Sequence, residues 1–145
     1  MVDFIKKKIE VEDPDARQVR QKGETVRDRF DLCRSNLFLI GLRGSGKSTL
    51  ARHVAHELQG EFRDTDILIA DRAGQTITDL VKASGWQAFR DLEHEVLAEV
   101  CASTGQVVAT GGGIVLRSDN RELLKKSGQV FYLMATPPLL AARLK

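Results

Sequence analysis

Short apolar runs alternate along this chain with longer segments whose apolar residues fall on one helical face. Residues 37–41 (LFLIG) and 130–134 (VFYLM) are continuous apolar runs, which predict strands buried on both faces of a sheet. Residues 62–66 and 107–110 are shorter runs that predict two further strands. Because strands and helical segments alternate, we expect an α/β fold in three layers, with a parallel sheet flanked by helices.

The helical segments have apolar residues three or four positions apart. Residues 47–59 show this spacing at Leu50, Val54 and Leu58. Residues 87–103 show it in a stripe formed by Phe89, Leu92, Val96 and Val100. Further helices are expected at residues 67–73, 76–84 and 121–126, with a last one beginning at Pro137 and Pro138.

The first 35 residues differ from the rest in composition. Residues 1–34 contain nine basic and eight acidic side chains, and their few apolar positions after Pro14 are compatible with a helix. A surface helix, a docking arm for an unknown protein partner and a disordered extension all fit this pattern. We therefore divide the chain into a charged extension (1–35) and a folded core (36–145).

Composition excludes several classes of function. The net charge is only +2, from 22 basic and 20 acidic residues, and no basic stripe is interleaved with aromatic residues, so we expect no nucleic-acid partner. No apolar run approaches the roughly 20 residues of a membrane span, and the N-terminus does not resemble a secretion signal. Cys33 and Cys101 have no metal-site spacing. These features favour a reduced, cytoplasmic protein without a membrane partner.

Residues 41–48 (GLRGSGKS) match the phosphate-binding pattern G-x-x-x-x-G-K-[ST], with a predicted strand before them and a predicted helix after them. The glycines let backbone N–H groups wrap closely around a triphosphate, and the helix N-terminus adds positive charge. Lys47 is expected to reach the β- and γ-phosphates, and Ser48 to ligate magnesium. The predicted ATP site comprises Gly44, Ser45, Gly46, Lys47, Ser48 and Thr49. Motors, GTPases and metabolite kinases share this motif, so it leaves the phosphate acceptor open.

Asp64 and Asp66 end a predicted strand about twenty residues after this loop. Ligands of open α/β sheets bind at the carboxyl ends of strands. One carboxylate can therefore hold the magnesium shell, and the other can accept a proton from a substrate hydroxyl. A simple N-cap of the next helix would give the same pattern.

Two further features point to a small acceptor. Arg90 and Glu93 lie three apart on one helix face, where a glutamate can hold the arginine fork toward a carboxylate. A surface salt bridge, worth about 0–1 kcal/mol, has the same spacing. Residues 111–113 are three consecutive glycines after a strand, which leaves room for a ligand against the backbone or, alternatively, forms a flexible loop.

In this order, these motifs resemble the shikimate kinase family. The matching segments are FLIGLRGSGKSTLARHVAHEL, FRDTD, GWQAFRDLE, VVATGGGIVL and NRELLKKSGQVFYL, within residues 36–145. The resemblance implies the P-loop fold of nucleoside monophosphate kinases. It also implies magnesium-dependent transfer of the γ-phosphate of ATP to the 3-hydroxyl of shikimate, a step of aromatic amino acid (chorismate) biosynthesis.

The resemblance also assigns roles to the candidate residues. Lys47 and Asp66 would be catalytic, with Asp66 as the base, and Ser48 and Asp64 would lie at the magnesium ion. Arg90 would bind the carboxylate of shikimate. The shikimate site would comprise Asp66, Arg90, Glu93, Gly111, Gly112 and Gly113.

This sequence departs from the family pattern in two places. Many members have Gly-Glu where this chain has Gly85-Trp86. The family also continues beyond residue 145 with a lid that carries an arginine, a second arginine, a fifth strand and a helix. Because phosphoryl transfer depends on charge neutralisation and exclusion of water, we expect weak or no catalysis from the chain as given, and an exposed sheet edge. A kinase for another hydroxy acid such as gluconate, and a non-catalytic ATP-binding module, are the alternatives.

Overall fold

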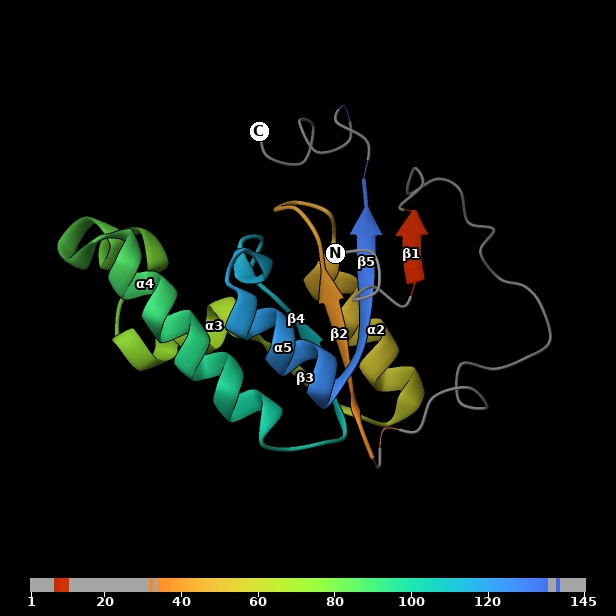
Figure 1. Ribbon diagram of the computed structural model, residues 1–145. Helices are drawn as coiled ribbons and strands as arrows, with labels where there is room; N and C mark the ends of the chain where they lie inside the picture. Colours follow the sequence, from red (N-terminus) through yellow and green to blue (C-terminus); the bar gives the residue numbers. More distant parts are fainter. Residues whose placement is uncertain (1–6, 11–31, 33, 136–137, 139–145) are drawn as a thin grey trace.

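A computed structural model describes residues 7–10, 32, 34–135 and 138, which form a parallel sheet with helices on both faces (Figure 1). The strand order in the sheet is β1-β5-β2-β4-β3. The strands are β1 (Lys7–Glu10), β2 (Asn36–Ile40), β3 (Glu61–Asp64), β4 (Gln106–Ala109) and β5 (Gly128–Met134). The helices are α2 (Lys47–Leu58), α3 (Thr65–Ala73), α4 (Ile77–Cys101) and α5 (Ser118–Ser127), with a 3₁₀ turn, η2 (Ile114–Leu116).

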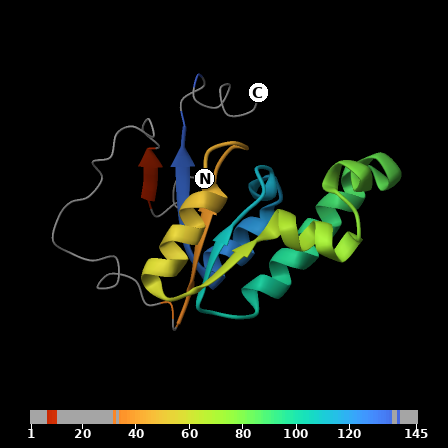
Figure 2. The same ribbon diagram turned by 180° about the vertical axis from the view of Figure 1, so that it is seen from behind.

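Alternate residues of β2 face opposite layers of the molecule, and every residue of this strand is buried. Leu37 and Leu39 pack in a cluster with α2 residues, whereas Phe38 and Ile40 pack with residues of α4, η2 and α5. Helix α5 lies in front of the sheet in Figure 1, and α2 lies in front of it in the reverse view of Figure 2. The predicted three-layer α/β fold is therefore confirmed.

Most of the elements expected in the core lie where the sequence pattern places them. Helix α4 is broken at Gly85, whose φ of 84° and ψ of 170° are not helical, so the two separate helices predicted around this position are confirmed. Strand β3 ends at Asp64, two residues before its predicted end, because α3 begins at Thr65. Asp66 consequently lies in the first turn of a helix and not at the end of a strand.

A strand in the charged extension, β1, is not predicted from the sequence. Strand β1 pairs in parallel with β5, with Lys7 opposite Phe131 and Glu10 opposite Met134. Strand β1 covers the side of β5 that does not pair with β2, so β1 and β3 are the edge strands of the described sheet. The helix-compatible part of the extension lies outside the described residues except for positions 32 and 34, and so does the expected last helix except for Pro138.

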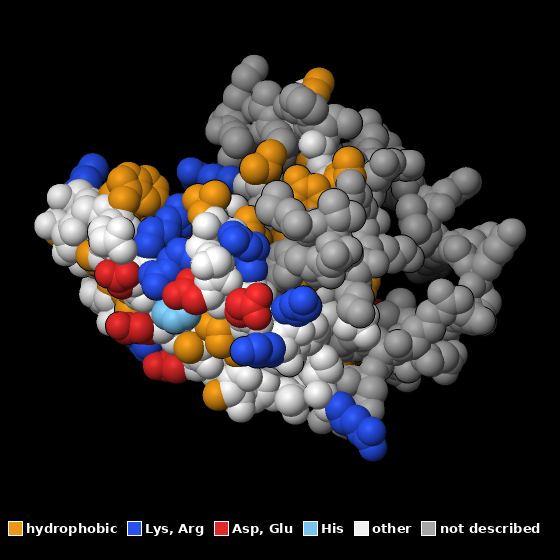
Figure 3. Space-filling view, viewed as in Figure 1, with side chains coloured by type: hydrophobic (Ala, Val, Ile, Leu, Met, Phe, Trp, Pro, Cys, Tyr) orange, Lys and Arg blue, Asp and Glu red, His pale blue; other side chains and the backbone are white. Residues whose placement is uncertain are grey.

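The face that carries α4 and α5 shows basic and acidic side chains beside one another, without a uniform patch of either charge (Figure 3). Within the part of the chain that the structure describes, no helix combines the length and apolarity needed to cross a bilayer.

Candidate active site

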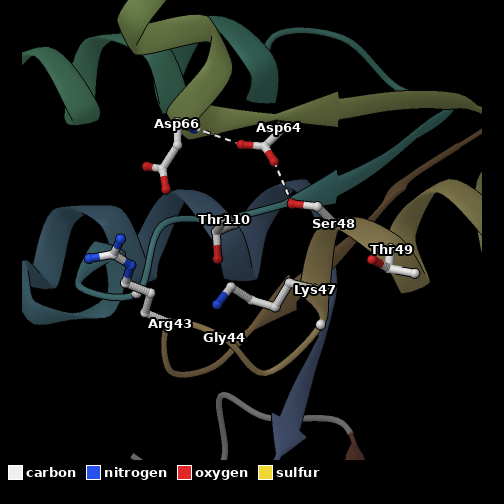
Figure 4. A pocket seen from close by; sticks show the side chains of 10 residues that line it. Arg43, Gly44, Lys47, Ser48, Thr49, Asp64, Asp66 and Thr110 are labelled. Carbon is white, nitrogen blue, oxygen red and sulfur yellow. Dashed lines mark hydrogen bonds between the residues drawn. The ribbon is translucent and has the colours of Figure 1, made fainter. Parts of the chain in front are cut away.

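The carboxyl ends of three neighbouring strands bring the predicted site residues together. The phosphate loop follows β2, Asp64 ends β3, and Thr110 and the glycine loop (residues 111–113) follow β4, which lies between the other two strands. They surround a cavity of about 350 Å³ (Figure 4). Its lining residues are Arg43, Gly44, Gly46, Lys47, Ser48, Thr49, Asp64, Asp66, Thr110 and Gly112.

The phosphate loop leaves the start of α2 open to an anion. Gly46 is the N-cap of α2 and has a left-handed conformation (φ 91°), which favours glycine, and no side chain caps the helix. Uncapped N–H groups at a helix N-terminus form an anion site. Ser45 lies within the loop, and its hydroxyl is buried without a hydrogen-bond partner among the described residues.

Lys47 lines this cavity and is almost fully buried. Its ammonium group donates hydrogen bonds to the carbonyl oxygens of Gly41 (2.7 Å) and Leu42 (2.8 Å). Burial lowers the pKa of Lys47, while the nearby carboxylates of Asp66 and Asp64 act in the opposite direction. A bound phosphate would supply further negative charge and favour the protonated lysine.

Asp64 serves both as a helix cap and as a partner of the phosphate loop. Its Oδ1 accepts hydrogen bonds from the N–H groups of Asp66 (2.9 Å) and Ile67 (3.3 Å), while the Ser48 hydroxyl donates to its Oδ2 over 2.5 Å. Asp64 can thus be both the N-cap of α3 and a carboxylate at the magnesium side of the site. A hydroxyl and a carboxylate fit magnesium, which takes oxygen ligands and commonly binds proteins through one or two residues together with substrate phosphates.

Asp66 faces the same cavity from the first turn of α3 (Figure 4). Its carboxylate accepts no hydrogen bond from the residues that the structure describes. Burial raises the pKa of Asp66, as does the negative charge of Asp64, while Lys47, Arg90 and Arg43 act in the opposite direction. A carboxylate with a raised pKa binds a proton more readily than an exposed aspartate, as a general base requires.

Glu93 is fully buried, so the Arg90–Glu93 pair is not an ordinary surface salt bridge. Nη1 of Arg90 donates to Oε1 of Glu93 over 2.9 Å, whereas Oε2 has no hydrogen-bond partner among the described residues. Burial raises the pKa of Glu93, while Arg90 acts to lower it. The buried carboxylate thereby fixes one side of the Arg90 fork.

The glycine loop passes so close to these charged groups that side chains would collide with them. A Cβ atom on Gly113 would lie 2.4 Å from Nη2 of Arg90. A Cβ atom on Gly111 would lie 2.8 Å from Oδ1 of Asp66 and 2.9 Å from Oε2 of Glu93. The loop therefore joins the phosphate cavity to the Arg90 side, and glycine at these two positions lets the backbone pass this close to the charged groups.

Comparison with known proteins agrees with this arrangement. A family model described as shikimate kinase matches residues 43–145. A shikimate kinase of Oleidesulfovibrio alaskensis is 49% identical over 108 residues, which cover 74% of this chain and 63% of that protein. One of Nitratidesulfovibrio vulgaris is 47% identical over 114 residues, which cover 79% of this chain and 64% of that protein.

The chain belongs to the shikimate kinase family. A solved shikimate kinase from Acinetobacter baumannii, in complex with shikimate, has 38% identity and a TM-score of 0.76, and the match covers 81% of this chain and 65% of that one. The predicted P-loop kinase fold is therefore confirmed. The chain spans less than two thirds of the length of each of these relatives.

Some residues that line this cavity, or that lie beside Arg90, are not predicted from the sequence. Arg43 and Thr110 line the cavity, and Arg43 occupies a variable position of the phosphate motif, which gives no signal. At Trp86 the sequence departs from the family pattern, and both packing over the substrate pocket and an ordinary packing role fit a tryptophan there. Its ring centroid lies 5.6 Å from the guanidinium carbon of Arg90, and Phe89 lies 5.0 Å from the same carbon. Two aromatic rings thus line the arginine that Glu93 holds.

Proposed function

We propose that this chain transfers the γ-phosphate of ATP to the 3-hydroxyl of shikimate, as a cytoplasmic step of aromatic amino acid biosynthesis. The observation that carries the proposal is the position of Asp66. It lines the cavity of the phosphate loop. A Cβ atom on Gly111 would collide with both Asp66 and Glu93, and Glu93 in turn holds Arg90. These contacts support one site in which the phosphate loop would hold the donor, Asp66 would be the base and Arg90 would bind an anionic acceptor.

The donor half of the site would hold ATP with magnesium. The open N-terminus of α2 and the ammonium group of Lys47 supply positive charge for the phosphates. Ser48 and Asp64 would hold magnesium, which when bound neutralises charge on the transferred phosphate group. Lys47 would exchange its hydrogen bonds with loop carbonyls for bonds to phosphate oxygens.

The acceptor half of the site fits a small carboxylic acid. Nη2 and Nε of Arg90 donate to no acceptor among the described residues, so this side of the fork is available for a carboxylate. Asp66 would orient the acceptor hydroxyl and take its proton. The hydroxyl oxygen then forms a bond to the γ-phosphorus, and the bond between that phosphorus and the oxygen of ADP breaks.

An ADP-release assay with several acceptors tests this proposal. We expect turnover with shikimate that exceeds turnover with gluconate or a nucleoside monophosphate. Arg90→Ala should lower kcat/KM for shikimate by about 10- to 100-fold, because a charge-assisted hydrogen bond to the carboxylate is lost. Equal turnover with gluconate would indicate a different acceptor. Stabilisation by ATP without ADP release from any acceptor would indicate a non-catalytic module.

A further inference from the structure

The carbonyl groups of the η2 turn, directly after the glycine loop, are all held by two side chains of α5. Nδ2 of Asn120 donates to the carbonyl oxygen of Ile114 over 3.0 Å. Nη1 of Arg121 donates to the carbonyl oxygens of Val115 (2.7 Å) and Leu116 (3.3 Å). The first turns of α5 thus fix the backbone that leaves Gly113.

The amide of Asn120 is itself oriented by the helix that carries Arg90. Asn120 is fully buried, and its Oδ1 lies 2.7 Å from Nδ1 of His94, one turn after Arg90 on α4. Because Nδ2 donates to Ile114, Oδ1 is the acceptor of this bond and Nδ1 of His94 is the donor. One buried amide therefore links α4 to the η2 turn.

Arg117 makes a second link to the same turn of α4. Its Nη1 donates to the carbonyl oxygen of Arg90 (3.3 Å) and to Oδ1 of Asp91 (3.0 Å). Its Nε and Nη2 donate to the two carboxylate oxygens of Asp119 (3.1 and 2.9 Å). Residues 117–121 are consequently joined both to the glycine-loop side and to the backbone of Arg90.

Gly113 and the Arg90 guanidinium lie so close together that a small shift of either would change how Arg90 is placed for a carboxylate substrate. We propose that Asn120 is a positioning residue for the acceptor: with Arg117 and Arg121 it fixes the glycine loop against Arg90 and so sets the affinity for a carboxylate substrate. This inference rests on the proposed function of Arg90 and the glycine loop. Asn120 acts through these groups and belongs to neither half of the site.

Asn120→Asp tests the proposal, and Asn36→Asp is its matched control. The aspartate keeps the size of Asn120 and its acceptor for His94, but loses the donor to Ile114. Asn36 is also fully buried, and its Nδ2 donates to the Ser103 carbonyl oxygen over 2.8 Å. It begins β2, at the opposite end of the strand from the phosphate loop. Each variant therefore loses one comparable hydrogen bond, near the glycine loop in Asn120→Asp and at the far end of β2 in Asn36→Asp.

We expect Asn120→Asp to raise KM for shikimate by about tenfold, the effect of one lost buried hydrogen bond, while KM for ATP and kcat change less than twofold. Asn36→Asp should change neither KM. If Asn120→Asp does not fold, Arg121→Met tests the same link at a less buried position. Arg121→Lys keeps a hydrogen-bond donor and should raise KM for shikimate less than Arg121→Met does. Equal changes in both KM values, or unchanged KM for shikimate in a folded variant, would overturn the inference.

Amide hydrogen exchange without ligands separates this inference from the proposed function. Asn120→Asp or Arg121→Met should speed exchange in residues 111–117 at least tenfold and leave the amides of α2 unchanged. If the wild-type chain phosphorylates no shikimate, this result still supports the positioning role, and the failure belongs to the proposed function. Unchanged exchange in residues 111–117 would overturn the positioning role, whatever the activity.

Discussion

The Ser48 hydroxyl donates to the Asp64 carboxylate over 2.5 Å, which joins the phosphate loop to the end of β3. Asp64→Asn and Asp64→Ala separate the two functions of this aspartate. Asparagine caps helices as well as aspartate does, whereas alanine costs about 1 kcal/mol of unfolding free energy. We expect only the alanine variant to unfold at lower denaturant concentration. Both variants should need more magnesium for half-maximal activity, because the carboxylate charge is lost. A magnesium requirement unchanged in Asp64→Asn would contradict a role for Asp64 at the metal.

Asp66→Asn should abolish phosphate transfer and stabilise the fold at neutral pH. The pKa of Asp66 is raised above the ordinary value of 3.8, so the folded state binds its proton more tightly than the unfolded state does. The stability that this group contributes is present below about pH 3.8 and is lost as pH rises through the raised pKa. Urea unfolding should therefore show a stabilising effect of Asp66→Asn at pH 7 that shrinks toward pH 4. An equal effect at both values would refute the raised pKa.

The pH dependence of kcat/KM for the wild-type chain should report the same group, because kcat/KM reports the pKa values of the free enzyme. As pH falls through the raised pKa of Asp66, the carboxyl becomes protonated and can no longer accept the proton of the acceptor hydroxyl. We expect kcat/KM to fall on the acid side, with a midpoint above 3.8. A flat profile down to pH 4 would argue against Asp66 as the base.

Sequence alone predicts well where the phosphate loop lies, because eight adjacent residues and their flanking elements carry the information. It predicts the acceptor half only in part. A buried Arg90–Glu93 pair and an exposed one have the same spacing, and only the packing of α4 against the glycine loop makes Glu93 inaccessible. The link from His94 to Asn120 spans 26 positions and has no local pattern.

Strand β1 shows a different limit of sequence analysis. Its sequence is KKIE, in which three of four residues are charged, so neither alternation nor apolar content predicts a strand. Pairing with β5 decides its structure, and that partner lies more than 100 positions away in the chain. The charged extension therefore contributes to the sheet in a way that local propensity does not reveal.

Replacing residues 7–10 by a Gly-Ser-Gly-Ser segment should expose the edge of β5. The ladder with β1 would be lost, and each backbone hydrogen bond contributes about 1 kcal/mol. We expect faster amide exchange in β5 and a lower free energy of unfolding. The amides of β4 should change less, because this strand pairs with β2 and β3 on its two sides. Equal protection of β5 in both proteins would show that β1 does not pair with it in solution.

Gly113→Ala should weaken binding of the acceptor and leave ATP binding intact. The added Cβ would lie 2.4 Å from Nη2 of Arg90, so the guanidinium must move away from the loop. We expect KM for shikimate to rise at least tenfold, an effect of the size expected for one displaced charged hydrogen bond. The same substitution in an Arg90→Ala background should have little further effect. Additive effects of the two substitutions would mean that Gly113 acts independently of Arg90.

Calorimetric titration most directly tests the central claim, that Arg90 and Lys47 serve separate acceptor and donor halves of one site. We predict that Arg90→Ala weakens shikimate binding at least tenfold and leaves ATP binding within twofold of the wild type. Lys47→Ala should weaken ATP binding and leave shikimate binding intact. Shikimate binding that is unchanged in Arg90→Ala would contradict the account.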